Sequence, residues 1–168
     1  PWSPQTYANA TIDGGTDNMT YFVSVSAKTQ DGFYRNSGTK YNQYDLKSNL
    51  DLKLNKYINL FMNLTGRMED RKYPTRSSEN IFRMLMRSKP NMPAYWPNGL
   101  PGPDIEFGDN PVVIATDATG YERDKRYILN GDFGVNINVP YVEGLTLKAT
   151  ASLDKNFRFR KIWQHPWT

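Results

Sequence analysis

Residues 44–54, which read YDLKSNLDLKL, decide the fold of this chain. Leucines at positions 46, 50, 52 and 54 alternate with charged or amide side chains. Because successive side chains of a β-strand point to opposite faces, this period of two predicts a strand with one apolar and one polar face. The alternation is also longer than the roughly five or six residues of an ordinary soluble strand.

A second alternating stretch begins at Ile58, and its apolar side chains again occupy even positions. Only residues 55–57 separate the two stretches, which predicts a hairpin with a short connection. Keeping both apolar sets on one face fixes the register. We therefore expect Leu52 opposite Leu60, and Asp45 opposite Arg67 as a cross-strand pair of opposite charges.

A longer hairpin is predicted between residues 126–139 and 145–160, joined by residues 140–144. Its apolar residues occupy odd positions, and the matching register sets Phe133 opposite Ala151. Upstream, alternation over residues 21–28 predicts another strand, preceded by a short strand at residues 9–13 and by a turn that contains Gly14, Gly15, Asp17 and Asn18.

The connections between these six strands alternate in length. Those at residues 14–19, 55–57 and 140–144 are short, whereas those at 31–38 and 72–125 are long, so all short turns are expected at one end of the sheet. The longest connection contains one predicted helix over residues 78–88, ended by Pro90. Its apolar stripe is expected to comprise Ile81, Phe82, Leu85 and Met86.

Composition excludes several classes of protein. The 168 residues carry a net charge of +4 spread along the chain, so we expect no nucleic-acid partner. Mean hydropathy is −0.70, and no apolar run reaches the roughly 20 residues of a membrane helix. The chain has no cysteine and a single histidine, His165, which disfavours thiolate sites and histidine catalysis. Because it begins at Pro1 without an initiator methionine, we expect it to be part of a longer protein.

Two all-β architectures fit the alternation. One is a soluble antiparallel sandwich; the other is an up-and-down sheet that forms part of a transmembrane β-barrel, with one long extracellular loop carrying a short helix. Strand length favours the barrel, as do the aromatic residues near strand ends: Tyr41, Tyr44, Tyr57, Tyr127, Tyr141 and Trp163. Six strands are fewer than the roughly eight of the smallest such barrels, so residues 1–168 are expected to be a partial barrel.

Several strings in the chain resemble the barrel of SusC/RagA-type TonB-dependent outer-membrane transporters. They extend over nearly the whole sequence: Gly14-Gly15-Thr16, Tyr21-Phe22-Val23-Ser24, Gln30-Asp31-Gly32-Phe33, Tyr44-Asp45-Leu46-Lys47-Ser48-Asn49-Leu50-Asp51, Pro93-Ala94-Tyr95-Trp96-Pro97-Asn98-Gly99, Gly108-Asp109-Asn110-Pro111 and Val139-Pro140-Tyr141-Val142-Glu143-Gly144-Leu145.

The resemblance implies a function in nutrient uptake across the bacterial outer membrane. It implies part of a barrel of about 22 strands, without its plug domain and remaining strands, that imports glycan fragments or peptides. The implied partners are a SusD-like surface lipoprotein, the TonB complex acting through the absent plug, the substrate and the lipid bilayer. No enzymatic activity and no cofactor are expected. The alternatives are a soluble carbohydrate-binding β-sandwich and a structural or adhesive surface protein.

Two groups of residues in the long connection are candidate sites. Tyr73, Tyr95, Trp96 and Phe107 could stack on sugar rings or contact the lipoprotein, or they could pack the loop onto itself. Asp104, Glu106 and Asp109, followed by Asn110, offer oxygen ligands of the kind that calcium prefers, although a solvated acidic turn is the simpler interpretation.

Charged residues on the predicted polar face of the strands form a third group. The cations on this face are Lys47, Lys53, Arg67 and Lys148, and the carboxylates are Asp45, Asp51, Glu69, Asp132 and Asp154. We expect structural ion pairing between them, because the two signs offset one another.

Overall fold

The computed structural model describes residues 2–34, 36–142 and 144–166. Within them the elements, in chain order, are β1 (Gln5–Thr16), β2 (Met19–Asp31), β3 (Lys40–Lys53), β4 (Ile58–Tyr73), α1 (Ser78–Arg87), α2 (Pro111–Ile114), the 3-10 turn η1 (Asp117–Thr119), β5 (Gly120–Asn138) and β6 (Thr146–Gln164). Pro1, Arg35 in the predicted 31–38 connection and Glu143 in the predicted 140–144 turn lie outside the described residues.

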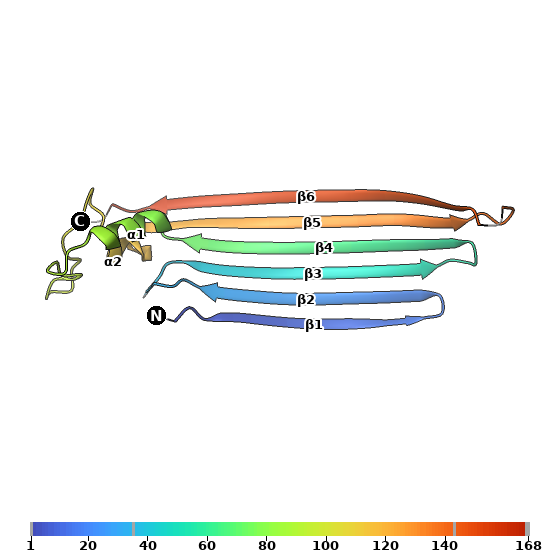
Figure 1. Cartoon of the computed structure of the whole chain (residues 1–168), viewed down its shortest axis with the longest axis horizontal. Coiled ribbons are helices and arrows are strands. Elements are labelled where there is room, and N and C mark those ends of the chain that lie inside the picture. The colour runs from blue at the N-terminus through green and yellow to red at the C-terminus, as the bar shows by residue number, and fades with distance from the viewer. Residues whose placement is uncertain (1, 35, 143, 167–168) are drawn as a thin grey trace.

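The six strands form one antiparallel up-and-down sheet in the order β1-β2-β3-β4-β5-β6 (Figure 1). The short turns all lie at one end of the sheet and the two longer connections at the other, as predicted. The sheet is not closed, so β1 and β6 each have one edge without a hydrogen-bonded neighbour among the described residues.

Both predicted hairpin registers are confirmed. Leu52 lies opposite Leu60 and Asp45 opposite Arg67 across β3 and β4. Phe133 lies opposite Ala151 across β5 and β6. In both hairpins the register follows from keeping the apolar side chains on one face, since a slip of one residue would reverse every side chain.

The strands are longer than predicted. β1 begins at Gln5 and ends at Thr16, so Gly14 and Gly15 are strand residues and the prediction that they form the turn is wrong. Gly14 lies beneath the Tyr21 ring of β2: a Cβ at position 14 would stand 2.7 Å from the Tyr21 hydroxyl oxygen. A glycine inside a strand often marks such a close approach.

The long connection is shorter than predicted because β4 and β5 extend into it. It spans residues 74–119, whereas 72–125 was expected. Residues 69–73 and 122–126 are mostly polar on both faces and therefore show no hydrophobic alternation, but they pair in register. One link across this pairing is the hydrogen bond from Arg123 Nε to Asp70 Oδ1, 2.9 Å long.

The long connection has its own small core. α1 is confirmed within one residue of its predicted end, and the Ser77 side chain caps it by accepting a hydrogen bond from the Asn80 N–H. The predicted apolar stripe is confirmed for Ile81 and wrong for Phe82, Leu85 and Met86, which are exposed. Ile81 packs with Met84, Ile114 and Ala115, and Tyr34 and Ile105 lie against them.

This core explains the different helix face. Tyr34, in the connection between β2 and β3, contacts the Phe82 ring edge to face at 5.7 Å. The Gly38 N–H donates to the Ala115 carbonyl at 2.9 Å. α1 therefore turns Ile81 and Met84 toward α2, an orientation set by contacts distant in sequence.

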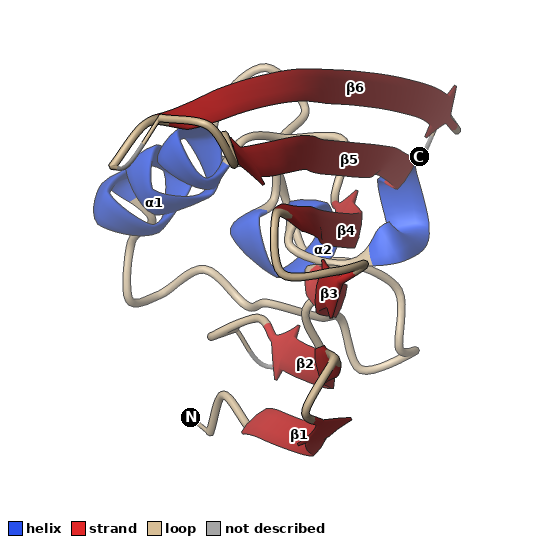
Figure 2. Ribbon diagram, turned by 90° about the vertical axis from the view of Figure 1, so that its right-hand side faces the viewer, coloured by secondary structure: helices blue, strands red, loops and turns tan. Residues whose placement is uncertain are grey.

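The two-sheet sandwich is not formed by the described residues. Viewed along the strands, the sheet is a single layer that runs from β1 to β6, with α1 and α2 at its end (Figure 2). In the described residues, no helix has the length and apolar character needed to cross a membrane.

Candidate functional site

One face of the sheet carries nearly all of its apolar side chains. The register aligns them in rows that cross all six strands, for example Gly14, Tyr21, Leu50, Met62, Phe133 and Ala151. We call the rows from Tyr44 to Leu54 on this face the apolar band. It consists of every second residue within six ranges, one for each strand in order: 8–16, 19–27, 44–54, 58–68, 127–137 and 147–157.

The apolar band is not covered by any other described element. Val25 is 52% exposed, Leu46 49% and Leu153 49%. The fully or nearly buried apolar side chains of the described residues lie in the long connection instead: Ile81, Met84, Val113, Ile114 and Ala115. An exposed apolar surface of this extent marks an interaction with a membrane, a ligand or another protein.

The apolar band is tallest on β3 to β6 and two residues shorter on β1 and β2. From Tyr44 to Leu54 the strand advances about 33 Å at its usual rise per residue. At the tilt of roughly 35–45° that strands adopt in closed barrels, this corresponds to a height of about 25 Å. The one charged residue in the band is Lys155, on the edge strand β6, whose Nζ lies 5.7 Å from the Phe157 ring centroid.

Aromatic residues mark one end of the band. The row nearest the long connection contains Ala27, Tyr44, Met68, Tyr127 and Phe157. Trp163 lies on the same face further along β6, opposite Tyr121. Tyr41 does not belong to this group, because it lies on the polar face and donates a hydrogen bond of 2.5 Å to Gln43 Oε1. Tyr57 and Tyr141 lie in the turns at the other end.

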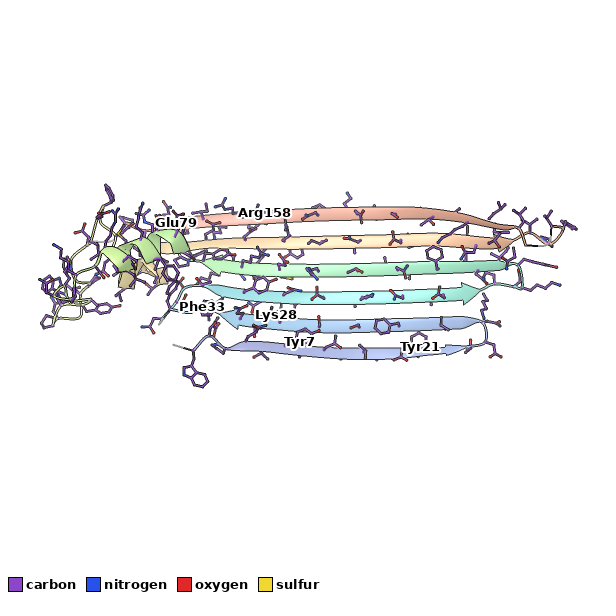
Figure 3. All side chains as sticks on the ribbon, viewed as in Figure 1. Tyr7, Tyr21, Lys28, Phe33, Glu79 and Arg158 are labelled. Carbon is purple, nitrogen blue, oxygen red and sulfur yellow. The ribbon has the colours of Figure 1, made fainter. Side chains whose placement is uncertain are left out.

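The opposite face is polar and is crossed by ion pairs. Asp45 Oδ1 accepts a 2.6 Å hydrogen bond from Arg67 Nε, and Asp45 Oδ2 accepts from Gln43 Nε2 at 2.6 Å and from Ser26 Oγ at 3.2 Å. The predicted ion pairing on this face is therefore confirmed for Asp45 and Arg67. Side chains follow every strand along the whole length of the sheet (Figure 3).

Other predicted members of the polar face have different partners. Lys148 Nζ lies 5.2 Å from the Phe61 ring centroid, and Asp132 Oδ1 accepts a 2.6 Å hydrogen bond from the Ser152 hydroxyl. Four further charged residues make no ion pair in the part of the chain that the structure describes: Lys47, Asp51, Lys53 and Asp154.

The polar face becomes more strongly charged near the long connection. Arg158 binds Asp124 through two nitrogens, the closer at 2.7 Å, and Arg160 Nε donates to Glu122 Oε1 at 2.6 Å. Arg71 Nη2 donates to Glu69 Oε2 at 2.8 Å. The hydrogen bonds from Arg158 hold the pKa of the Asp124 carboxyl below its ordinary value, although partial burial acts in the opposite direction.

Phe61 is the one aromatic side chain in the middle of the polar face of β4. It lies directly opposite Gly134, and a Cβ at position 134 would stand 2.1 Å from the Phe61 ring. The glycine therefore makes room for the ring to lie across β5.

The four predicted aromatic site residues do not come together. Tyr73 is the last residue of β4 and faces the polar side, opposite Glu122. Tyr95 and Trp96 lie in a small turn closed by the Tyr95–Pro101 bridge and by the Trp96 N–H donating to the Leu100 carbonyl at 2.8 Å. Phe107 is 86% exposed. Among the described residues, none of the four makes an aromatic pair.

The acidic residues of the long connection each have a separate structural partner. Asp104 accepts the Gly108 N–H at 2.9 Å, Glu106 pairs with Arg87, and Asp109 accepts from Arg76 Nε at 2.9 Å. Asp109 is only 6% exposed, so the prediction of a solvated acidic turn is wrong for it. No group of three acidic or histidine side chains arranged to hold a metal occurs in residues 2–34, 36–142 and 144–166.

Sequence reasoning missed a cationic row on the apolar face, beyond the apolar band. Lys40, Lys72, Arg123 and Lys161 lie directly opposite one another across β3, β4, β5 and β6. The two hairpin registers predicted from sequence already pair Lys40 with Lys72 and Arg123 with Lys161. If the predicted strands were a few residues longer, each predicted hairpin would contain two of the four cations of the row.

Comparison with known proteins adds no identification. No protein-family model matches this chain, and no curated protein sequence matches it significantly. The function must therefore be argued from the two faces of the sheet.

Proposed function

We propose that this chain forms part of the wall of a transmembrane β-barrel in the bacterial outer membrane. The single observation that carries the proposal is the uncovered apolar band, about 25 Å high at barrel tilt, backed by a face of ion pairs. In this arrangement the apolar band contacts lipid and the polar face lines the lumen. The membrane-spanning segments are residues 8–16, 19–27, 44–54, 58–68, 127–137 and 147–157.

The unpaired edges support a larger barrel. β1 and β6 comprise 12 and 19 residues, and neither has a second neighbour among the described residues. Long exposed strand edges promote aggregation, and closure into a barrel removes them. Since about eight strands are the minimum for a bacterial barrel, further strands would pair with β1 and β6.

The orientation follows from the lengths of the connections. Outer-membrane barrels have short periplasmic turns and longer extracellular loops. The turn at Asp17–Asn18 and the connections at 54–57 and 139–145 would then face the periplasm. Residues 32–39 and 74–119, with α1, α2 and their core, would face the outside, where a substrate or lipoprotein would first be met.

Within this class, we propose a TonB-dependent importer of the SusC/RagA type. The support is the sequence resemblance, together with a polar face that carries charges of both signs, several of them in ion pairs, since mixed charges leave a lumen wall that is wet but not strongly selective for one sign. The cargo would be a glycan fragment or a peptide, received with a SusD-like surface lipoprotein. The chain would bind and conduct its cargo without catalysing a reaction.

Uptake by cells that carry the complete protein tests this function. Labelled oligosaccharides and peptides should enter wild-type cells, and uptake should be lost when either this protein or TonB is removed. The protein should be recovered in the outer-membrane fraction. Recovery in the soluble fraction, or uptake that is unchanged without the protein, would contradict the proposal.

A variant in the long connection tests whether the turn that contains Tyr95 and Trp96 contacts the cargo or the lipoprotein. Trp96→Ala, in the turn closed by Tyr95 and Pro101, should reduce uptake or lipoprotein association if the turn meets either one. Phe33→Ala, in the neighbouring connection and 71% exposed, is the matched control. Unchanged uptake and association in Trp96→Ala would assign Trp96 to loop packing alone.

A further inference from the structure

Beyond the apolar band, the same face of the sheet carries an unusual set of like charges. The four members of the cationic row, Lys40, Lys72, Arg123 and Lys161, are direct cross-strand neighbours, an arrangement that is unfavourable without counter-ions. Lys125 adds a fifth cation one row nearer the band. We call these five residues the cationic cluster.

The protein supplies too few carboxylates to neutralise this cluster. Asp70 binds Arg123 and lies 4.0 Å from Lys125, and Asp117 binds Lys72. In the described part of the chain, Lys40 and Lys161 have no carboxylate oxygen within ion-pairing distance. Asp31, opposite Lys40 on β2, makes no ion pair in that same part. Positive charge therefore exceeds negative charge at this place.

The geometry holds these cations beside aromatic rings. Lys72 Nζ and Lys161 Nζ lie 5.7 and 6.0 Å from the Tyr121 ring centroid. A hollow of about 380 Å³ lies between Tyr121, Arg123, Lys125, Tyr127, Phe159 and Lys161. Three cations and three aromatic rings therefore line the same hollow.

The height of the cluster matches a lipid headgroup layer. Lys40 is four residues beyond Tyr44, or about 13 Å along the strand and roughly 10 Å along a barrel axis at the usual tilt. The polar layer outside the hydrocarbon core is about 5–8 Å deep on each side, so Lys125, one row nearer the band, lies within this layer and Lys40 lies at its outer edge. The face that carries the cluster is the continuation of the face that would contact lipid, not the one that would line the lumen.

Resting on the proposed function, we propose that the cationic cluster binds phosphate-bearing headgroups of glycolipids in the outer leaflet. Lysine and arginine recognise phosphate through charge-assisted hydrogen bonds, and basic pockets at membrane surfaces bind anionic headgroups. The acyl chains of the same lipid would lie on the apolar band, so that one lipid molecule would contact both the cationic cluster and the band. The cluster would anchor the barrel at a fixed depth.

Lipid binding to the complete protein tests the proposal. The protein is purified in a neutral detergent, and bound lipid is counted by native mass spectrometry after adding diphosphorylated lipid A or the same lipid with its phosphates removed. Wild type should bind the phosphorylated lipid preferentially. Lys40→Gln combined with Lys161→Gln should weaken this binding by about tenfold to thirtyfold, because two cations near the headgroup are lost.

The control removes two lysines from the opposite face. Lys47→Gln combined with Lys148→Gln changes net charge equally and should leave lipid binding unchanged. Equal binding of both lipids by wild type, an equal loss in both double variants, or displacement of lipid by millimolar inorganic phosphate without any lipid preference would overturn the headgroup site.

Two further outcomes distinguish a failure of the headgroup site from a failure of the barrel proposal. If the protein inserts into phosphatidylcholine vesicles but does not prefer the phosphorylated lipid, the headgroup site is wrong and the barrel proposal stands. If it inserts into no vesicle of either composition, both proposals are wrong.

Discussion

Asp45 on β3 and Arg67 on β4 lie directly opposite each other and form a 2.6 Å ion pair on the polar face. Asp45 is also held by Gln43 and Ser26, so its carboxylate accepts hydrogen bonds from three neighbouring side chains on β2, β3 and β4. The hydrogen bonds that Asp45 accepts therefore link β2, β3 and β4 to one another.

A double-mutant cycle on this pair should reveal modest coupling. The side chains of Arg67 and Asp45 are 44% and 24% exposed, so solvent weakens their attraction. We expect Asp45→Asn and Arg67→Gln to couple by about 0.5–1 kcal/mol in urea unfolding of the protein in detergent. Asp51→Asn with Arg67→Gln is the control pair and should show additive effects. Additivity in both cycles would show that the ion pair contributes nothing to stability.

Gly134 should tolerate no side chain because of Phe61. Gly134→Ala sets a Cβ 2.1 Å from the Phe61 ring, so the ring must leave its position, at a cost of about 1–3 kcal/mol in unfolding free energy. In a Phe61→Ala background, Gly134→Ala should lower the free energy of unfolding much less, because the ring is no longer there. Gly66→Ala is the matched control, because its nearest contact is 4.0 Å away at Leu46, and its effect should stay within about 0.5 kcal/mol.

The pairing beyond the apolar band should weaken in acid. The hydrogen bond from Arg123 holds the pKa of Asp70 below its ordinary value. A carboxyl whose pKa is lower in the folded state stabilises the fold above its unfolded pKa, near 3.9, and this stabilisation is lost as pH falls through the folded value. Wild type should therefore lose more stability than Asp70→Asn between about pH 6 and about pH 2. Parallel pH profiles would contradict this role of Asp70.

Charges placed on the two faces should have unequal effects. Leu50→Arg places a cation in the middle of the apolar band and should lower the folding free energy in lipid by about 2–4 kcal/mol. Asn49→Arg, one residue away on the polar face, should be tolerated. Folding measured by heat-modified gel mobility in lipid vesicles compares the two, and equal losses would be inconsistent with one lipid-facing side.

Much of the sheet could be predicted from sequence because it depends on local alternation. In the β3–β4 hairpin, apolar residues at nearly every second position and a short connection leave one register that keeps the apolar side chains together. The same argument set Phe133 against Ala151. These features need only neighbouring residues, and they were confirmed.

The parts that were missed depend on partners distant in sequence. The strand ends at Tyr73 and Gly120 are polar on both faces, so only contacts such as the one between Asp70 and Arg123 show that pairing continues. In the long connection, the buried side of α1 is set by α2 and Tyr34, which periodicity within the helix does not reveal.

The candidate site divides in the same way. The two chemically different faces followed from alternation, whereas no local pattern showed that Asp109 would bind Arg76 or that Asp104 would cap the Gly108 N–H. The cationic row needed both the registers and the true strand lengths. Members that lie directly opposite each other are separated by as many as 51 positions along the chain, between Lys72 and Arg123.

Single-cysteine labelling of β3 tests the central claim most directly, because the chain contains no cysteine of its own. A fluorophore is attached in turn at each position from 45 to 52 of the complete protein in lipid vesicles. The account predicts that quenchers carried on lipid tails act at positions 46, 48, 50 and 52, and that aqueous iodide acts at 45, 47, 49 and 51. Quenching by iodide at all eight positions, with none from the lipid-borne quencher, would contradict a membrane-facing apolar band.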